Sequence, residues 1–212
     1  MEPICYIVGA MADTLDIRPQ PGDLLIAADA GLPPVQRAGL TPDLIVGDFD
    51  SLGYVPEGEN VLRHPVKKDD TDMMLAVRLG LARGFAAFRL YGGVGGRTDH
   101  TLANLQTLGF LAAHGAYGCL YGEREAFTVL LGRSLRFPPA CRGLISVFAF
   151  GGEASGVCLS GLLYPLEGRP LTPFFPLAVS NAFTGRAAEI SAEAGALLVV
   201  WEADNPLPEW RI

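Results

Sequence analysis

Asp48 and Asp50 follow a short apolar run, in the segment Gly47-Asp48-Phe49-Asp50-Ser51. The run Leu44–Val46 predicts a buried strand, and Gly47 is expected to let the backbone turn where the strand ends. Two carboxylates so close together repel each other, and Mg²⁺ would relieve the repulsion because it prefers hard oxygen ligands. An Asx-turn, with one carboxylate on a backbone N–H and the other solvated, explains this segment equally well.

A second acidic segment, Lys67-Lys68-Asp69-Asp70-Thr71-Asp72, comes directly before a stretch with helical spacing. Asp70 or Thr71 could cap this helix, and acids in its first turn would favour the helix dipole. Capping accounts for one or two acids, but not for three beside the two lysines of a chain that otherwise uses arginine. In the functional interpretation Asp69 or Asp72 contacts metal or substrate, and Lys68 faces phosphate oxygens.

Four glycines in five positions, Gly92-Gly93-Val94-Gly95-Gly96, stand before Arg97, Asp99 and a further predicted helix. Glycines let backbone N–H groups approach an anion, and a helix N-terminus favours negative charge. The spacing matches neither the P-loop nor the dinucleotide fingerprint. Arg97 could bind phosphate through two N–H groups, whereas Asp99 could act in catalysis or cap the helix. Acids for Mg²⁺, a glycine-rich loop and an arginine together fit phosphoryl-group chemistry.

Strands alternate with helices in the first half, which predicts parallel β-α units covered on both faces. The expected strands are 4–10, 24–28, 44–46, 60–64 and 87–91, and the expected helices are 33–39, 72–83 and 100–113. In such sheets ligands bind beyond the carboxyl ends of the strands. The polar residues fall at these ends, as Asp29, Asp48/Asp50, Asp69/Asp72 and Arg97/Asp99. Their convergence favours an active site over four separate turns.

The second half has a different texture, with short apolar runs separated by Gly and Pro. The expected strands are 127–131, 145–150, 156–159, 179–182, 187–190 and 197–201. Short strands without helical periodicity predict an antiparallel β-sandwich. We therefore predict an α/β domain over residues 1–123, with a parallel sheet, and a β-sandwich domain over residues 124–212.

Composition excludes several classes of partner. A net charge of −7, with no basic stripe, argues against a nucleic acid. No apolar run approaches the roughly 20 residues of a membrane span, and the N-terminus resembles no signal peptide. The four cysteines are widely spaced among apolar residues without a CxxC pair, so buried free thiols and a cytoplasmic location are expected.

The three motifs, in this order and spacing, resemble those of the bacterial thiamine pyrophosphokinases. The resemblance rests on residues 47–51, 68–72 and 92–100, and it extends to Asn104 and to Val179-Ser180-Asn181. It implies an α/β catalytic domain, a thiamine-binding β-sandwich, and a homodimer with active sites at the subunit interface. The implied reaction is transfer of the pyrophosphoryl group of ATP to the hydroxyl of thiamine, giving thiamine diphosphate and AMP with Mg²⁺.

Roles for individual residues come with the resemblance. Asp48, Asp50 and Asp72 would hold the metal and orient the thiamine hydroxyl. Asp50, Asp72, Lys68 and Arg97 form the implied catalytic set, in which Arg97 faces ATP phosphates.

The resemblance also implies a set of binding residues. Those expected to contact nucleotide, metal or thiamine are Asp29, Ser51, Thr71, Gly95, Gly96, Asp99, His100, Asn104, Ser180 and Asn181. Among these, Gly95 and Gly96 would face ATP phosphates, and Ser180 and Asn181 would reach thiamine from the partner subunit. The chain departs from the family pattern at Pro33-Pro34 and at Ala182, where an acidic residue is common.

Two other functions compete with this reading. A nucleotide-sugar transferase could use Asp48-Phe49-Asp50 as its metal motif, but it gives no role to the Lys68–Asp72 segment. A non-catalytic nucleotide or thiamine sensor on the same fold should lack a catalytic acid, and none of the three motifs has such a gap.

Overall fold

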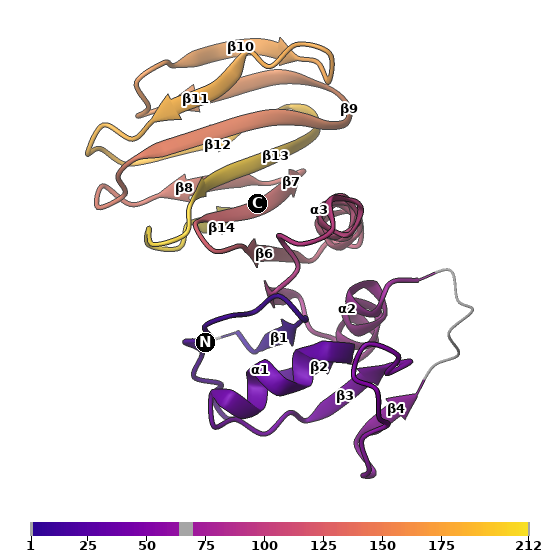
Figure 1. The fold of residues 1–212 in the computed structure, drawn as a ribbon. Helices are drawn as coiled ribbons and strands as arrows, with labels where there is room; N and C mark the ends of the chain where they lie inside the picture. Colours follow the sequence, from indigo (N-terminus) through magenta and orange to yellow (C-terminus); the bar gives the residue numbers. More distant parts are fainter. Residues whose placement is uncertain (1, 64–69, 212) are drawn as a thin grey trace. The chain divides into compact units, whose positions relative to one another are not determined.

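The computed structural model describes residues 2–63 and 70–211. Contacts divide the chain into two compact units, Met1–Glu123 and Arg124–Ile212. Figure 1 shows helices and strands alternating in the first unit and strands alone in the second. No helix in the described ranges is long and apolar enough to cross a membrane.

The first unit is built on a parallel sheet with the strand order β6-β5-β1-β2-β3-β4. Its strands are β1 (Ile4–Val8), β2 (Leu24–Ala28), β3 (Leu44–Gly47), β4 (Val61–Arg63), β5 (Ala87–Tyr91) and β6 (Tyr117–Tyr121). Every residue of β2 is buried, as expected for a strand that is covered on both faces. The predicted parallel α/β class is thus confirmed for this unit.

Helices cover both faces of this sheet. The helical segments are η1 (Asp29–Gly31), α1 (Leu32–Arg37), α2 (Asp72–Ala82) and α3 (Thr98–Ala113). On one face α1 contributes Leu32 and Val35 to a core with Val8. On the other face α2 packs so closely that a Cβ on its Gly80 would lie 2.6 Å from the ring of Phe88.

Several predicted boundaries differ from the structure, and the three that follow bear on the site. The first strand ends at Val8 instead of residue 10, which places Gly9 and Ala10 in the following loop. The last helix begins at Thr98, so Asp99 lies inside its first turn. The fourth strand spans Val61–Arg63, and the expected end at residue 64 lies outside the described residues.

The second unit is an antiparallel β-sandwich, which confirms the predicted class. Its strands are β7 (Glu125–Leu131), β8 (Ser134–Phe137), β9 (Leu144–Ser160), β10 (Leu166–Leu171), β11 (Ala178–Ala182), β12 (Ala188–Ser191), β13 (Ala194–Glu202) and β14 (Glu209–Arg211). Trp201 of β13 meets Phe137 of β8 edge to face, with ring centroids 5.4 Å apart, so the two sheets share a core.

Strand β9 belongs to both sheets of the sandwich. Its first half pairs with β13 and β11, and its second half pairs with β12 and β10. The chain bends between the halves at Gly151, whose φ is 72°. The sequence predicted two strands here, 145–150 and 156–159. A glycine pair in the sequence suggests the end of a strand, whereas here it forms a bend within one continuous strand.

Candidate active site

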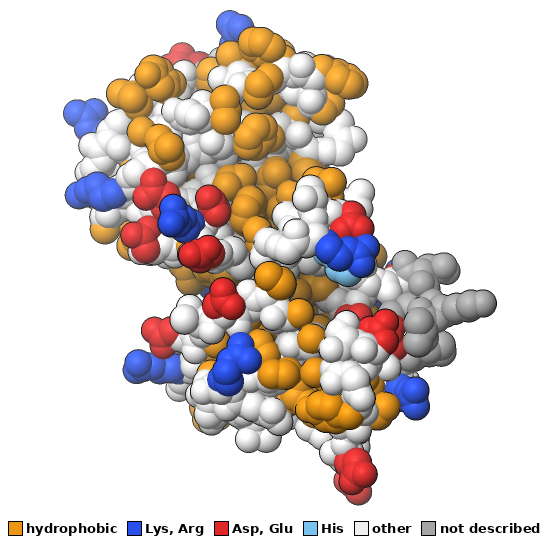
Figure 2. Space-filling view, in the orientation of Figure 1, with side chains coloured by type: hydrophobic (Ala, Val, Ile, Leu, Met, Phe, Trp, Pro, Cys, Tyr) orange, Lys and Arg blue, Asp and Glu red, His pale blue; other side chains and the backbone are white. Residues whose placement is uncertain are grey.

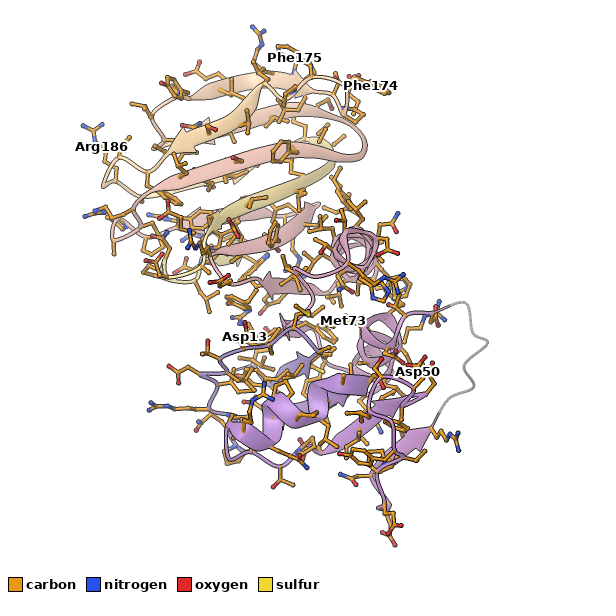
Figure 3. The ribbon with its side chains drawn as sticks, viewed as in Figure 1. Asp13, Asp50, Met73, Phe174, Phe175 and Arg186 are labelled. Carbon is orange, nitrogen blue, oxygen red and sulfur yellow. The ribbon has the colours of Figure 1, made fainter. Side chains whose placement is uncertain are left out.

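A cavity of about 430 Å³ opens at the carboxyl ends of the parallel strands. The loops that follow β1, β2, β3 and β5 line it, together with the first turns of α2 and α3. Strand β1 lies between β2 and β5, so the chain leaves its two sides in opposite directions and opens a crevice there. Figure 3 labels Asp50 and Met73, two of the residues that line this cavity.

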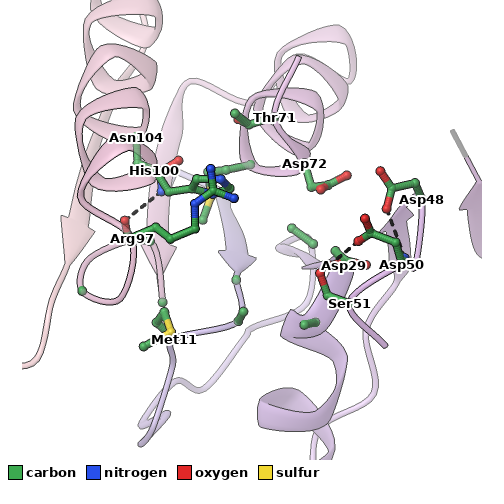
Figure 4. Close-up of a pocket in the computed structure, with 18 of the residues that line it drawn as sticks. Met11, Asp29, Asp48, Asp50, Ser51, Thr71, Asp72, Arg97, His100 and Asn104 are labelled. Carbon is green, nitrogen blue, oxygen red and sulfur yellow. Dashed lines mark hydrogen bonds between the residues drawn. The ribbon is translucent and has the colours of Figure 1, made fainter. Parts of the chain in front are cut away.

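Three carboxylates form an acidic group on one side of the cavity. Asp29 follows β2, and Asp48 and Asp50 follow β3; one oxygen of each lies within 4.8 Å of the others. Figure 4 shows the three side chains facing a common space, with Asp72 nearby at the start of α2. Like charges this close disfavour one another, and hard oxygen donors in this arrangement suit a divalent cation.

Asp29 is the buried member of this acidic group. Its side chain is only 8% exposed, and its buried Oδ1 has no hydrogen-bond partner among the described residues. A buried carboxylate oxygen without a partner is costly unless a cation or donor meets it. The sequence assigned the metal to Asp48, Asp50 and Asp72, whereas the structure groups Asp29 with the first two.

Local backbone geometry brings Asp29 against β3. Its φ is 45°, in the left-handed region, where the chain turns from β2 into η1. A Cβ on Gly47 would lie 3.0 Å from both Cα and Cβ of Asp29, so the missing side chain at Gly47 makes room for this approach. The helix α1 follows at once and carries its prolines in the first turn, where a missing N–H costs nothing.

Phe49 lies between the two loop aspartates in sequence and packs into the core. It is buried in the core beside Val8 and Val35, and its φ is 65°. The prediction that the chain turns at Gly47 is wrong. Gly47 ends β3 without a positive φ, and the left-handed residue of the turn is Phe49. The anchored ring therefore leaves the carboxylates on either side of it to face the cavity.

The Asx-turn interpretation of this loop is confirmed, and the turn leaves room for the metal interpretation, which stays a prediction. Oδ1 of Asp48 accepts the backbone N–H of Asp50 at 3.1 Å, which is an Asx-turn. The hydroxyl of Ser51 donates to Oδ1 of Asp50 at 3.0 Å. A carboxylate has about four lone-pair directions, so accepting a hydrogen bond does not prevent either acid from binding a cation.

The start of α2 forms another part of the cavity lining. Thr71 is the N-cap, and its hydroxyl accepts the N–H of Met74 at 3.2 Å. Asp70 instead pairs with Arg78 at 3.4 Å, which decides between the two predicted caps. Asp72 lines the cavity from the first turn. Lys68, an expected catalytic residue, lies outside the described residues.

The glycine-rich loop after β5 faces the acidic group across the cavity. Gly92 has a φ of 67°, and a Cβ there would lie 2.4 Å from the carbonyl oxygen of Gly9, so the two loops touch through their backbones. Buried Asn104 donates from Nδ2 to the carbonyl oxygen of Gly93 at 2.7 Å. This bond fixes the loop on α3, and Gly95 lines the cavity beyond it.

Arg97 reaches the cavity from the N-cap position of α3 and is tied to Asp99. Its Nε and NH2 groups donate to the two carboxylate oxygens at 3.1 and 2.6 Å. The guanidinium lowers the pKa of Asp99 to about 2. Oδ1 of Asp99 also accepts the N–H of His100 at 2.9 Å, but Asp99 lies inside the first turn and Arg97 occupies the N-cap position, so the interpretation of Asp99 as the cap is wrong. His100 lines the cavity, whereas Asp99 and Gly96 are not among the residues that line it.

Ser180 and Asn181 lie in β11 of the second unit. Ser180 is exposed with a φ of 57°, and its N–H donates to the hydroxyl of Ser146 at 3.0 Å. Asn181 is buried, and its amide makes paired bonds with the backbone of Tyr164, at 2.9 Å to Oδ1 and 2.7 Å from Nδ2. Its side chain therefore holds the Tyr164 segment in place.

The loop after β1 is the part of the site that sequence reasoning missed. Gly9, Ala10 and Met11 line the cavity, and so does buried Met73 from α2. Gly9 directly follows an apolar run, as Gly47 and Gly92 do, and that shared pattern could have identified it. The predicted first strand ran to residue 10, so Gly9 was placed inside a strand and not in a loop at its end.

Two family models match the chain on either side of the unit boundary. The model of the thiamin pyrophosphokinase catalytic domain matches residues 20–116, and the model of its vitamin B1 binding domain matches residues 135–197. The chain belongs to the thiamin pyrophosphokinase family. Within the family's catalytic domain the match includes the acidic group, the start of α2 and the glycine-rich loop.

Individual family relatives share the whole architecture. A curated thiamine pyrophosphokinase from Bacillus subtilis is 26% identical over 199 residues, covering 85% of this chain and 88% of the relative. The crystal structure of the thiamine pyrophosphokinase from B. subtilis has a TM-score of 0.82 at 24% identity and covers 95% of this chain and 99% of its own. That of the Candida albicans thiamin pyrophosphokinase has a TM-score of 0.77 at 13% identity, covering 96% and 90%. These structural likenesses support the fold.

Proposed function

We propose that this chain transfers the pyrophosphoryl group of ATP to the hydroxyl of thiamine, giving thiamine diphosphate and AMP. The observation that carries the proposal is the cavity itself, in which an acidic group faces a glycine-rich loop and an arginine inside the family's catalytic domain. An acidic wall suits a metal and the cationic thiamine, and the loop with Arg97 suits phosphate. The sugar-nucleotide transferase and the non-catalytic binder are less well supported, because the family match is to an enzyme of this reaction.

Mg²⁺ fits the residues that are present. Asp29, whose buried Oδ1 has no hydrogen-bond partner among the described residues, forms with Asp48 and Asp50 a group of the right donor chemistry. We propose that these three hold the ion and that Asp72 completes the wall towards substrate. Bound Mg²⁺ would supply charge neutralisation on the polyphosphate and polarise the phosphorus that is attacked.

The chain's own residues bind and orient the two substrates, and one of them accepts a proton. The thiamine oxygen forms a bond to the β-phosphorus of ATP, and the bond from that phosphorus to the oxygen bridging it to the α-phosphorus breaks. Asp72 or Asp50 accepts the hydroxyl proton, since both carboxylates face the cavity. Arg97 and the loop N–H groups stabilise the charge that collects on the departing AMP. Lys68 would add a second cation to the phosphates.

We further propose that the second unit presents thiamine to the cavity of a partner copy. Near Ser180 the second unit exposes a set of large apolar side chains, Leu163, Tyr164, Phe174, Phe175, Leu177 and Val179. Figure 2 shows hydrophobic surface over this part of the sandwich, and Figure 3 places Phe174 and Phe175 there. Exposed apolar patches of this kind mark interaction surfaces. Light scattering should give twice the mass of one chain, and a monomeric mass would contradict the homodimer.

A reducing compartment such as the cytoplasm suits the thiols. The described chain contains no disulfide: Cys5, Cys119, Cys141 and Cys158 are free, and the first three are buried. Burial raises the pKa of the Cys5 and Cys119 thiols to about 12, which keeps them protonated and unreactive.

The deciding experiment incubates the protein with ATP, MgCl₂ and thiamine and measures AMP and thiamine diphosphate. We expect both products in equal amounts, and Asp50→Asn should lower turnover by at least ~100-fold with a small change in melting temperature. Asp16→Asn removes an exposed acid outside the cavity and serves as the matched control. AMP formation no greater than in a thiamine-free reaction would overturn the proposal.

A further inference from the structure

The adenosine half of ATP needs a surface that the acidic group and the glycine-rich loop do not supply. Both of those parts of the cavity recognise charge, whereas a nucleobase binds through its flat apolar faces. Among the described residues that line the cavity, Met11 is the large apolar side chain that is exposed, at 50%. Met73 also lines the cavity, but it is buried in the core.

Met11 is held where a nucleotide would emerge from the phosphate loop. Its backbone N–H donates to the carbonyl oxygen of Gly92 at 3.2 Å, which ties it to the glycine-rich loop. A Cβ on Gly96 would lie 3.3 Å from its sulfur, so the thioether lies on the bare backbone of that loop. Figure 4 shows Met11 below Arg97, across the cavity from the acidic group.

We infer that Met11 is a nucleobase platform and contributes to the nucleotide selectivity of the reaction. The inference rests on the proposed function, because it takes ATP as the ligand of this cavity. Were the acidic group to hold Mg²⁺ and the terminal phosphates, and the glycine-rich loop the α-phosphate, the base would extend towards Met11. A polarizable thioether makes favourable contacts with aromatic rings.

The chemistry of the platform sets its selectivity. A thioether has no hydrogen-bond donor and is a weak acceptor, so Met11 contacts the face of a base and does not read its edge. Purines offer a larger face than pyrimidines, which predicts ATP and GTP binding within about threefold of each other and both tighter than CTP or UTP. Thiamine also carries an aromatic ring, but its positive charge disfavours the side of the cavity that holds Arg97.

Binding measurements on the full chain test the inference without turnover. Met11→Ala should weaken Mg-ATP binding by about two- to twelvefold, the range of a lost sulfur–aromatic contact. Inorganic tripolyphosphate, which has no base, should bind equally well to both proteins. Leu102→Ala, which truncates an exposed apolar side chain outside the cavity, is the matched control and should bind both ligands as the wild type does.

An oxidation footprint provides a second readout on the wild-type protein. Hydrogen peroxide transfers one oxygen atom to the thioether, giving methionine sulfoxide and water, and half-buried Met74, which is not among the residues that line the cavity, is the internal reference. ATP should slow oxidation of Met11, whereas tripolyphosphate should not.

Four outcomes separate this inference from the proposed function. Equal ATP affinity of wild type and Met11→Ala, or equal protection by ATP and tripolyphosphate, overturns the platform and leaves the proposed function standing. Protection by thiamine in place of ATP also overturns it. Failure of the wild type to bind ATP at all overturns both.

Discussion

Replacing Gly47 by alanine should weaken magnesium binding more than it weakens the fold. The new Cβ would lie 3.0 Å from Cα and Cβ of Asp29 and 3.3 Å from its N. Carbon atoms in contact sit at about 3.5–4.0 Å, so Asp29 must move by roughly half an ångström. Asp29 cannot easily move away from β3, because Gly31, two residues later, is tightly packed against β1. A Cβ at Gly31 would overlap the carbonyl oxygen of Val8.

A displacement of this size matters for the acidic group. Binding constellations tolerate about 0.5 Å of error, and changes that shift a metal ligand through its neighbours typically lower affinity ~10- to 100-fold. Overpacking costs about 1–3 kcal/mol of folding free energy, and the restricted unfolded chain of alanine offsets ~0.4–1 kcal/mol. The net loss of about 1–2 kcal/mol should lower the melting temperature of a chain of this length by ~2–8 °C.

The assay is the magnesium dependence of thiamine diphosphate formation at saturating ATP and thiamine, with Mn²⁺ binding measured in parallel by calorimetry. Gly47→Ala should raise the half-saturating metal concentration at least tenfold. Gly53→Ala is the matched control: it strains a left-handed turn after the same loop, with a φ of 72° and no atom within 4 Å of the new Cβ. It should destabilise the chain to a similar extent without changing the metal requirement.

Two results would refute this reasoning. Wild-type metal dependence in Gly47→Ala would show that the position of Asp29 does not govern binding. An equal rise in Gly53→Ala would show that the effect follows stability and not the spacing of the ligands.

Three further changes test other contacts of the site and of the second unit. Asn104→Ala should lose its bond to the glycine-rich loop, cost about 1–3 kcal/mol of folding free energy and raise the KM for ATP more than that for thiamine, as denaturant unfolding and steady-state kinetics would show. The Asp99 carboxyl should titrate by NMR near 2 and return towards 3.8 in Arg97→Gln; because its pKa is lowered in the fold, the stabilisation by this pair is present at neutral pH and is lost progressively as the pH falls from 3.8 through about 2. Asn181→Ala should leave the backbone N–H and C=O groups of Tyr164 without their hydrogen-bond partners. This should lower the melting temperature by several degrees and raise the KM for thiamine but not for ATP.

Sequence alone located the acids of the site but could not separate ligands from caps. Asp23 and Asp43 lie at the amino ends of the strands, where they accept the N–H groups of Ile4 and Leu25 at 2.8 and 2.7 Å. Acids therefore occur at both ends of the strands, and position at a strand end does not by itself distinguish a ligand from a residue that holds the backbone. What distinguishes Asp29 is a buried oxygen without a described partner, and that depends on contacts between β2 and β3 which no local pattern encodes.

Most elements of the first unit were predictable because each depends on local periodicity, although strand β6 was missed. The helix 72–83 ends within a residue of α2, where Gly84 follows with a φ of 86°. Strands of the sandwich were harder, since their partners are distant in sequence. β10 and β14 are exposed or short, so they carry no apolar alternation, and pairing with β9 and β8 defines them.

Strained backbone marks the same places that chemistry does. Among the described residues, three that are not glycine have a positive φ: Asp29, Phe49 and Ser180. The left-handed conformation costs an ordinary residue about 1–2 kcal/mol, and this chain uses glycine for it at seventeen other positions. A side chain is needed at each exception: a carboxylate at Asp29 for the acidic group, and a buried ring at Phe49 to aim Asp48 and Asp50. By the same reasoning the strain at Ser180 supports a contact made by its hydroxyl, since a residue kept only for the turn would be glycine.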